Sequence, residues 1–430
     1  MLSSEDAALL TMTDSGTVMG TLLRKYWIPA FLSSELQVGG SPQRVELLGE
    51  SLVAFRSSSD VVGVVGEFCA HRRASLFYGR NETDNFPDGR CGLRCAYHGW
   101  KYDHHGNCID MPNEPPTSKF KDRIKLKSYQ AQERGGVVWV YMGTDDAPGL
   151  PELEWVMLDE RHKFISRRLQ RTNFMQAMEG GLDSSHVSFL HSDAPLWNPP
   201  WTHQSSGVRK HLKAGNPKFF VEPTDYGLLI GARRITDLED YYWRITQWIM
   251  PWYTVVPRDE FEPIGAHAWV PIDDQNCWVW SINYLPEGPL SHEQLEFYRN
   301  GGGIHAETIP GTHMPVRNRE NQYLVDRALQ KSGVSLSGIA GIAMQDAAMQ
   351  ESMGPVVDRR EEHLGSTDIG VVTARRRLIA EAKSCAAGNQ SVSGRDPETH
   401  RVRSASAVLK PDASWVEATS QARSALESLY

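Results

Sequence analysis

Two short cysteine–histidine pairs constrain the first third of this chain more than any other feature of its sequence. Cys69 is followed two positions later by His71, and Cys95 is followed three positions later by His98. Both pairs stand where a strand-like run gives way to a turn, so two loop tips could close on one metal centre. Two thiolates and two imidazoles suit either a tetrahedral zinc ion or a 2Fe-2S cluster with cysteines on one iron and histidines on the other.

The spacing of the pairs and their flanking residues favour the cluster. A C-x-H pair is tighter than the spacings usual in zinc fingers. The first pair lies in CAHRRASL and the second in CAYHGW. This text resembles the Rieske centre of ring-hydroxylating oxygenases, which is written C-x-H-R and C-x2-H-G-W. The intervening segment is longer than expected for that family, through an insert near residues 83–89, and it contains Cys91, which lacks a histidine three residues on.

The length and the pattern of strand-like and helical runs predict an α+β protein. With 430 residues, the chain exceeds one ordinary domain. Residues 1–147 are expected to form an N-terminal lead-in and an all-β Rieske domain, because β-branched and aromatic runs alternate with turns. Residues 155–386 are expected to form a catalytic domain with an antiparallel sheet covered by helices. Residues 387–430 are expected to be a polar linker followed by a C-terminal docking helix.

The composition excludes several partners and locations. A net charge of -8 argues against nucleic-acid and anionic-membrane partners, since both reward a basic surface. The N-terminal residues lack the basic region and apolar core of a secretory signal, and no stretch approaches the roughly 18–20 apolar residues of a membrane span. Six cysteines are too few for a disulfide scaffold. A reducing, cytoplasmic location is therefore expected.

A second group of candidate ligands lies in the segment EGGLDSSHVSFLH. On an ideal helix Asp183 and His186 share one face, whereas His191 is about 140° away from His186. A local bulge would bring the two imidazoles together, and Gly180 and Gly181 would make the helix easier to distort. From these residues alone, the histidines could equally be packed or solvated on an amphipathic helix.

Together the two groups resemble the large (alpha) subunit of Rieske non-haem iron aromatic ring-hydroxylating oxygenases, in the phthalate dioxygenase-like branch. Those enzymes carry mononuclear iron on a D-x2-H-x4-H pattern, so the resemblance implies that His186 and His191 are iron ligands. It points to Asp346, in GIAMQDAAMQESMG, as the carboxylate of the site. Without the resemblance, Asp346 would be interpreted as a helix-surface carboxylate.

The resemblance also gives Asp183 a role in electron transfer. In the family this aspartate hydrogen-bonds an iron-ligand histidine of its own subunit and a cluster histidine of the next subunit. By resemblance these are His186 and His98 of the partner subunit. A head-to-tail ring of this kind implies a homotrimer or stacked trimers.

The cofactors and partners follow from the resemblance as well. It implies one Rieske 2Fe-2S cluster and one mononuclear Fe(II) per subunit, with O2 and an aromatic small molecule as substrates. The chain has no G-x-G-x-x-G dinucleotide fingerprint and no plant-type C-x4-C-x2-C, so it is not expected to take hydride from a nicotinamide. Electrons would come from an NADH-dependent flavin and iron–sulfur reductase, or from a reductase plus a ferredoxin.

The predicted function is that of a terminal oxygenase that inserts O2-derived oxygen into an aromatic carboxylate, as in phthalate dioxygenation. The alternative is monooxygenation, which would appear as O-demethylation or ether cleavage of an aromatic acid. Arg244, on a strand-like run with aromatic neighbours, could bind the substrate carboxylate or form an ordinary salt bridge. Ser184 is a second substrate contact by resemblance. The remaining polar candidates are weaker: Arg209 and Arg233 as substrate contacts, and His104, His105, His203 and His267 as surface or structural histidines.

Two rival classes stay open from the sequence. An electron-transfer protein would need the cluster but no second metal site, and a ligand-binding module could be stabilised by zinc. Metal content separates the three classes, since the oxygenase would hold three irons and two sulfides, the carrier two irons and the module zinc.

Overall fold

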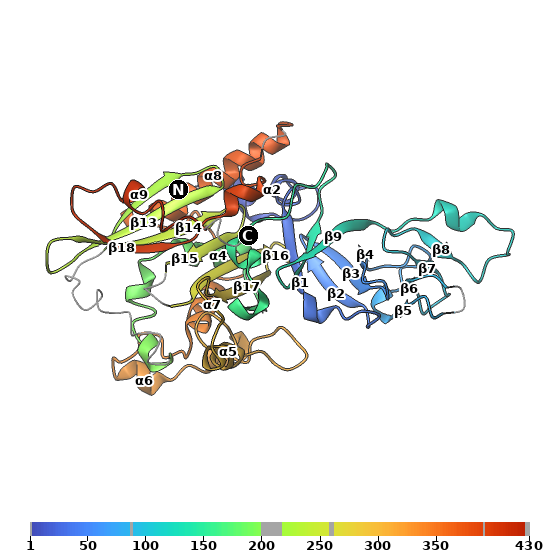
Figure 1. Cartoon of the computed structure of the whole chain (residues 1–430), viewed down its shortest axis with the longest axis horizontal. Helices are drawn as coiled ribbons and strands as arrows, with labels where there is room; N and C mark the ends of the chain where they lie inside the picture. The colour runs from blue at the N-terminus through green and yellow to red at the C-terminus, as the bar shows by residue number, and fades with distance from the viewer. Residues whose placement is uncertain (1, 87–88, 199–216, 258–261, 390–391, 426–430) are drawn as a thin grey trace. The chain divides into compact units, whose positions relative to one another are not determined.

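The computed structural model describes residues 2–86, 89–198, 217–257, 262–389 and 392–425. The chain divides into two compact units. The smaller unit comprises residues 14–16 and 23–148, and the larger unit comprises residues 1–13, 17–22 and 149–430. The two units are coloured blue to teal and green to red, respectively, over most of their length in Figure 1.

The smaller unit is all-β, as expected, and contains two antiparallel sheets. The six-stranded sheet has the order β1-β10-β9-β4-β3-β2, and the four-stranded sheet has the order β5-β6-β7-β8. The strands of the first are β1 (Trp27–Leu32), β2 (Gln43–Leu47), β3 (Glu50–Arg56), β4 (Val62–Gly66), β9 (Ser128–Arg134) and β10 (Val137–Tyr141). Those of the second are β5 (Arg80–Glu82), β6 (Gly92–Arg94), β7 (Lys101–Tyr102) and β8 (Cys108–Asp110).

The larger unit is built on one antiparallel sheet of eight strands, in the order β11-β17-β16-β15-β14-β13-β12 with β18 paired to β14. Its strands are β11 (Lys163–Gln170), β12 (Lys218–Pro223), β13 (Gly227–Ile235), β14 (Tyr241–Ile249), β15 (Tyr253–Val256), β16 (Ile264–Pro271), β17 (Cys277–Tyr284) and β18 (Ala405–Leu409).

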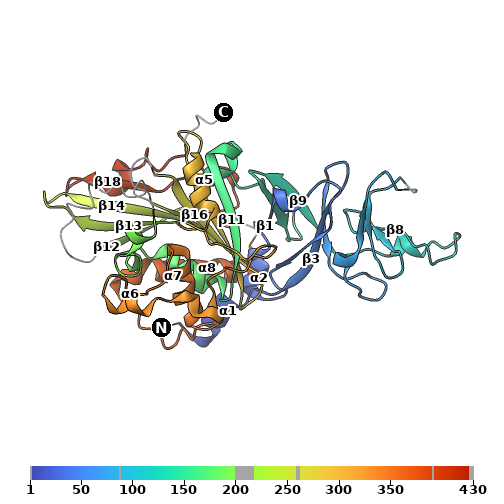
Figure 2. The same cartoon turned by 90° about the horizontal axis from the view of Figure 1, so that it is seen from below.

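Helices cover one face of this sheet, which confirms the α+β fold class. The covering helices are α1 (Ser4–Thr11), α4 (Phe174–Leu182), α6 (Arg327–Lys331), α7 (Ile342–Ser352) and α8 (Ile369–Ala386). Figure 2 shows α1, α6, α7 and α8 together below the strands. The other helices are α2 (Val18–Leu23), α3 (Glu154–Met157), α5 (His292–Arg299) and α9 (Trp415–Ala418). Among the described residues, every helix is too short or too polar to cross a lipid bilayer.

The N-terminal lead-in does not pack with the smaller unit. We expected residues 1–147 to form an N-terminal lead-in and a Rieske domain, and α1, within that lead-in, belongs to the larger unit. The carbonyl of Thr11, at the end of α1, accepts a hydrogen bond of 2.9 Å from Asn173 Nδ2, and Asp6 forms an ion pair of 2.7 Å with Lys383 on α8. Helix α1 is therefore anchored to the sheet-covering helices.

The C-terminal segment contains a strand where only a polar linker was expected, and the helix that follows packs on the sheet. Strand β14 is nine residues long, and β15 pairs with only its last three residues, Gln247–Ile249. Strand β18 pairs with the rest of that edge, from Tyr241 to Ile245, and so satisfies backbone groups that β15 leaves open. Trp415 of α9 then stacks on Trp243 of β14, with ring centroids 5.0 Å apart. The segment is part of the catalytic fold.

Candidate metal centres and cavity

The first cysteine–histidine loop follows β4 and folds back on itself. The backbone N–H of Cys69 donates to Ala74 O at 2.9 Å, and the N–H of Arg73 donates to Cys69 O at 2.9 Å. Arg73 has a φ of 63°, in the left-handed region that closes such a turn. Cys69 is buried in a hydrophobic cluster that also contains Cys95 of the second loop.

The second loop connects β6 and β7 and is equally tight. The N–H of Cys95 donates to Trp100 O at 2.8 Å, and the N–H of Gly99 donates to Cys95 O at 3.1 Å. Gly99 has a φ of +78°, and a Cβ there would lie 2.6 Å from Pro112 Cγ. A glycine is required at this position for both reasons.

The two loops bring together a donor set that fits a Rieske cluster. The imidazoles of His71 and His98 have ring centroids 4.4 Å apart, and His71 stacks on Trp100 at 4.6 Å. The Nδ1 atoms of both histidines are buried and have no hydrogen-bond partner, although buried polar atoms normally have one. Two orphaned imidazole nitrogens beside two buried thiols are the donors that a 2Fe-2S cluster with two histidine ligands needs.

Electrostatics and hydrogen bonding in the loops favour a thiolate. The hydrogen bond between the two thiols lowers the pKa of Cys95, with help from backbone N–H groups and against burial, and raises the pKa of Cys69. The Tyr102 hydroxyl lies 3.2 Å from Cys69 Sγ and accepts the backbone N–H of Ala70 at 3.2 Å. Cys91 lies apart from this group, with its Sγ 3.3 Å from Ser58 Oγ.

A charged network that the sequence analysis missed braces the second loop. Arg94 donates to Gly99 O at 2.5 Å and forms ion pairs of 2.8 Å with Glu82 and with Asp110. Lys101 is fully buried and pairs with Glu82 at 3.0 Å. Burial opposes the ionisation of Glu82, but its hydrogen bonds with the arginines and Lys101 dominate and lower its pKa to about 2.

The second candidate centre contains His186, His191 and Asp346. His191 Nε2 lies 3.2 Å from His186 Nε2 and 3.3 Å from Asp346 Oδ1, and His186 Nε2 lies 3.6 Å from the same oxygen. Among the described residues, this is the only group of three His, Cys, Asp or Glu side chains whose ligand atoms lie within 4.8 Å of one another. Two imidazoles and one carboxylate form the facial donor set of non-haem Fe(II) oxygenases.

The backbone reaches this geometry by ending a helix, not by bulging it. Helix α4 ends at Leu182, and Asp183 has extended angles (φ -93°, ψ 115°). The Asp183 carboxylate accepts the N–H of Ser185 at 2.6 Å and that of His186 at 3.3 Å. Asp and Ser favour such local turns over helix interiors. The expectation that Asp183 and His186 share a face of one continuous helix was therefore wrong.

The two glycines of α4 also serve a different purpose from the one expected. A Cβ at Gly180 would lie 2.4 Å from Gln350 Nε2, and one at Gly181 would lie 2.4 Å from Trp269 Cη2. Their missing side chains let α4 lie directly against α7 and β16. The two glycines therefore permit close packing of α4 and do not serve to distort it.

Each histidine of the triad is oriented through its other nitrogen. His186 Nδ1 lies 3.3 Å from Asp183 Oδ2, and His191 Nδ1 lies 2.7 Å from Gln345 Oε1. The Gln345 amide is fixed in turn, because its Nε2 donates to the buried Asp193 carboxylate at 2.8 Å. Such outer partners hold a histidine ring in place, so that Nε2 could face a metal ion. Sequence reasoning missed Gln345, whose one signal is its place next to Asp346.

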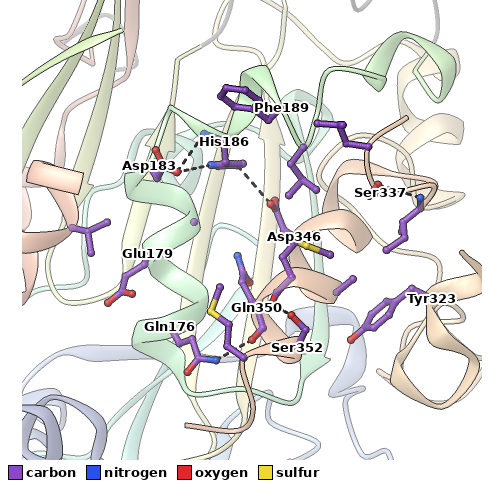
Figure 3. A pocket seen from close by; sticks show the side chains of 18 of the residues that line it. Gln176, Glu179, Asp183, His186, Phe189, Tyr323, Ser337, Asp346, Gln350 and Ser352 are labelled. Carbon is purple, nitrogen blue, oxygen red and sulfur yellow. Dashed lines mark hydrogen bonds and ion pairs between the residues drawn. The ribbon is translucent and has the colours of Figure 1, made fainter. Parts of the chain in front are cut away.

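The charges of the triad stabilise one another. Burial disfavours protonation of His186, but its hydrogen bond with Asp183 and the charge of Asp346 outweigh burial and raise its pKa. Burial likewise opposes ionisation of Asp346, and the neighbouring histidines overcome it and lower the pKa. Figure 3 shows His186 between the carboxylates of Asp183 and Asp346.

A cavity of about 280 Å³ lies between the triad and the sheet. Arg244 and Ser184, the two predicted substrate contacts, both line it. The Arg244 guanidinium is buried and donates to Pro257 O at 3.1 Å. In the part of the chain that the structure describes, no carboxylate pairs with Arg244, so the expected alternative of an ordinary salt bridge has no support there.

Some of the other polar candidates lie elsewhere than expected. His267 lines the cavity, whereas we expected a surface or structural histidine. Arg168, which the sequence analysis did not single out, also lines the cavity. Arg233 does not line it and lies over the Tyr241 ring at 4.0 Å. His104 and His105 lie together in the smaller unit, and Arg209 and His203 fall outside the described residues.

A second, more open cavity of about 820 Å³ begins on the other side of the triad. Its wall includes Asp183, His186 and Asp346 and extends along α7 to Tyr323, as Figure 3 shows. Exposed apolar side chains line it, among them Phe189 and Leu336, which are 57% and 59% exposed. Asp183 therefore stands at the edge of an apolar groove.

Comparisons with known proteins match both parts of the chain. Residues 26–130 match the family model described as the Rieske [2Fe-2S] domain, and residues 140–428 match the one described as LigXa C-terminal domain like. The chain is 36% identical to the 3-chlorobenzoate-3,4-dioxygenase oxygenase subunit of Comamonas testosteroni, with 88% of each chain covered. It is 33% identical to the phthalate 4,5-dioxygenase oxygenase subunit of Pseudomonas putida, covering 96% of this chain and 94% of that one.

A more distant relative is named for another reaction, and solved structures share the fold. The 5,5'-dehydrodivanillate O-demethylase oxygenase subunit of a Sphingobium species is 28% identical, with 90% of this chain and 82% of that one covered. Among solved structures, dicamba monooxygenase bound to 3,6-dichlorosalicylic acid superposes with a TM-score of 0.58 at 16% identity, covering 86% of this chain and 100% of that one. At that identity the likeness concerns the fold alone.

Proposed function

Because this chain belongs to the Rieske non-haem iron oxygenases, as an oxygenase subunit, we propose that its two cysteine–histidine pairs hold the 2Fe-2S cluster and that its triad holds the mononuclear iron. The cluster ligands are Cys69, His71, Cys95 and His98, and the iron ligands are His186, His191 and Asp346. When bound, the cluster passes single electrons and the iron activates O2 beside the substrate. The observation that carries the proposal is the triad at the wall of a cavity.

We further propose that the substrate is an aromatic acid whose carboxylate binds Arg244. A buried guanidinium is costly to leave without an anion, and a carboxylate can accept two parallel hydrogen bonds from it. The Ser184 hydroxyl lines the same cavity and can donate a further hydrogen bond. Val256 and Trp269 give the cavity apolar walls that exclude water from the aromatic body. The similarity to chlorobenzoate and phthalate dioxygenase subunits supports this substrate class.

Dioxygenation is the reaction that these two relatives favour. Monooxygenation leading to O-demethylation is the second candidate, supported by the similarity to the dehydrodivanillate demethylase subunit. Both reactions use the same ligands and the same cavity, so they differ in where the substrate carbon is held relative to the iron.

The groove beside Asp183 supports a head-to-tail assembly. We propose that the cluster domain of a second copy docks on its exposed apolar side chains and that His98 of the partner subunit hydrogen-bonds Asp183. The Asp183 carboxylate is 24% exposed, and its Oδ1 keeps acceptor capacity beyond the one hydrogen bond that it accepts from the Ser185 N–H, whereas Oδ2 has two partners on His186. A heterologous contact of this kind closes into a ring, of which the homotrimer or stacked trimers are the proposed forms.

The electron donor is a separate protein. Oxygenase subunits of this family work with reductase or ferredoxin partners, and we propose an NADH-dependent flavin and iron–sulfur reductase. The exposed edge of the cluster loops offers a contact surface, with Arg72 lying over the Tyr97 ring, which is 58% exposed.

The test is turnover with a reductase of this type, NADH, 18O2 and a panel of benzoates and phthalates. We expect three irons and two sulfides per chain, and labelled oxygen in the product. A protein that holds both metal centres but oxygenates no aromatic acid would refute the substrate class. Zinc in place of iron would refute the oxygenase assignment of the ligands. Two atoms of label in a diol would distinguish dioxygenation from a demethylation that releases formaldehyde.

A further inference from the structure

His267 lies on the floor of the 280 Å³ cavity, near the middle of the sheet. Its cross-strand neighbours are Thr254 on β15 and Ser281 on β17. Because side chains alternate along a strand, Trp269 faces the same way, and the two rings stack with centroids 5.0 Å apart. Trp269 lines the cavity as well.

The imidazole of His267 has unused hydrogen-bonding capacity. Its Nδ1 is fully buried and has no hydrogen-bond partner, and the structure gives none for Nε2 among the described residues. His267 as a whole is partly accessible, whereas its neighbours Ala266 and Ala268 are buried. Since His267 lines the cavity, that accessible part of the ring faces the cavity. A polar group in this position needs a partner from the cavity contents.

A second buried histidine of the larger unit, His305, has a purely structural role and serves as a comparison. His305 is 1% exposed, and its two ring nitrogens lie 2.6 Å from Ser166 Oγ and 3.1 Å from Asn283 Oδ1. Both of its nitrogens are therefore satisfied by the protein. His267 has neither bond, and it is not a member of the metal-binding triad.

The charge state of His267 restricts what it can bind. Burial lowers its pKa to about 4, with Asp346 opposing this shift and Arg168 adding to it. The ring is then neutral near pH 7 and offers one donor and one acceptor. A neutral imidazole does not compensate a second carboxylate as a guanidinium does. It suits an oxygen substituent without charge, such as a hydroxyl, an alkoxyl or a carbonyl.

We propose that His267 is a specificity-determining residue that hydrogen-bonds a neutral oxygen substituent of the aromatic acid whose carboxylate binds Arg244. This rests on the proposed function of the same cavity. Arg244 and His267 lie two strands and about four residues apart, which is roughly 10 Å across and 13 Å along the sheet between backbones. Both side chains line one cavity, so one substituted aromatic ring fits between the two polar ends.

The discrimination follows from the cost of an unpaired polar group. A site that hydrogen-bonds a substrate hydroxyl rejects the analogue without it, because the buried partner is left unsatisfied. For a single neutral hydrogen bond we expect a preference of about tenfold for hydroxybenzoates or methoxybenzoates over methyl- or chlorobenzoates of matched shape.

The experiment measures equilibrium binding of these ligand pairs to the iron-loaded holoenzyme by calorimetry, without turnover. In His267→Phe the tenfold preference should disappear, with hydroxybenzoate affinity falling to that of the chloro analogue and the latter unchanged. His267→Asn should keep part of the preference, since an amide can hydrogen-bond in its place. His292→Phe, on the exposed side of α5, should behave as wild type. Iron content and the visible spectrum of the cluster verify each variant.

Three results are possible. Loss of the preference in His267→Phe and its partial rescue in His267→Asn support the assignment. Binding of aromatic acids with no preference in the wild type, or an unchanged preference in His267→Phe, overturns it while leaving the proposed function intact. Absence of binding of any aromatic acid to the wild type overturns the proposed function itself.

Discussion

The hydrogen bond between Tyr102 and Cys69 should set part of the reduction potential of the cluster. The Tyr102 hydroxyl accepts the N–H of Ala70, so its own proton is free to point at Cys69 Sγ, 3.2 Å away. The residue is fully buried, and water cannot replace the bond if the hydroxyl is removed. Hydrogen bonds to the sulfur ligands of a cluster raise its potential, because reduction adds negative charge to those sulfurs.

The size of the effect can be worked out from this one contact. A hydrogen bond to a charged acceptor contributes about 1.5–3 kcal/mol, and we take about 1 kcal/mol of it as present only in the reduced state. For a one-electron step, a tenfold change in the equilibrium corresponds to about 59 mV and about 1.4 kcal/mol. Tyr102→Phe should therefore lower the potential by roughly 40 mV.

The assay is a redox titration followed by the visible or circular dichroism spectrum of the cluster. The matched control is Tyr141→Phe, in the same unit, which removes a buried hydroxyl that bonds Asp145 at 2.7 Å. Both variants should lose on the order of 1 kcal/mol in free energy of unfolding, but only Tyr102→Phe should change the potential. An unchanged potential in Tyr102→Phe with the cluster intact, or an equal shift in the control, would refute the reasoning.

Three further predictions concern the charged residues of the two centres. Arg244→Leu should raise the KM for aromatic acids at least tenfold with cluster reduction unchanged. Arg233→Leu, outside the cavity, should leave the KM as it is. Equal effects of the two substitutions on the KM would show that Arg244 does not bind the substrate. Asp183→Asn should keep its iron but slow electron delivery in single-turnover experiments, whereas His186→Ala should lose the iron; loss of iron in both would place Asp183 among the ligands. Glu82 has a pKa lowered to about 2, so its ion pairs stabilise the fold above pH 4.5, and that contribution is lost as the pH falls from about 4.5 to 2. Glu82→Gln should thus cost on the order of 3 kcal/mol in urea unfolding at pH 7, with the difference from wild type shrinking at pH 3.5. A difference that does not depend on pH would contradict the ionised network.

The residues of the cluster loops could be predicted from the sequence because their geometry is local. Cys69 and His71 share one turn, Cys95 and His98 another, and Gly99 permits the second turn to close. The same holds for His186 and His191, which are five residues apart, although the helix break at Asp183 that brings them together was not foreseen. Asp346 is distant in sequence, and only resemblance to a family pointed to it, since no local pattern distinguishes it from a surface carboxylate.

Tertiary structure alone decided what surrounds these residues. Strand β18 fills the edge of β14 that β15 leaves open, so its role depends on the length of another strand. Gln345 can hydrogen-bond His191 only because the fold brings α7 beside that histidine. The sequence does not distinguish His267 from His305, yet His305 has two hydrogen-bond partners whereas His267 has none among the residues that the structure describes. Residue types fix which hydrogen bonds a side chain can make, but the packing of distant elements decides which of them are left for a substrate.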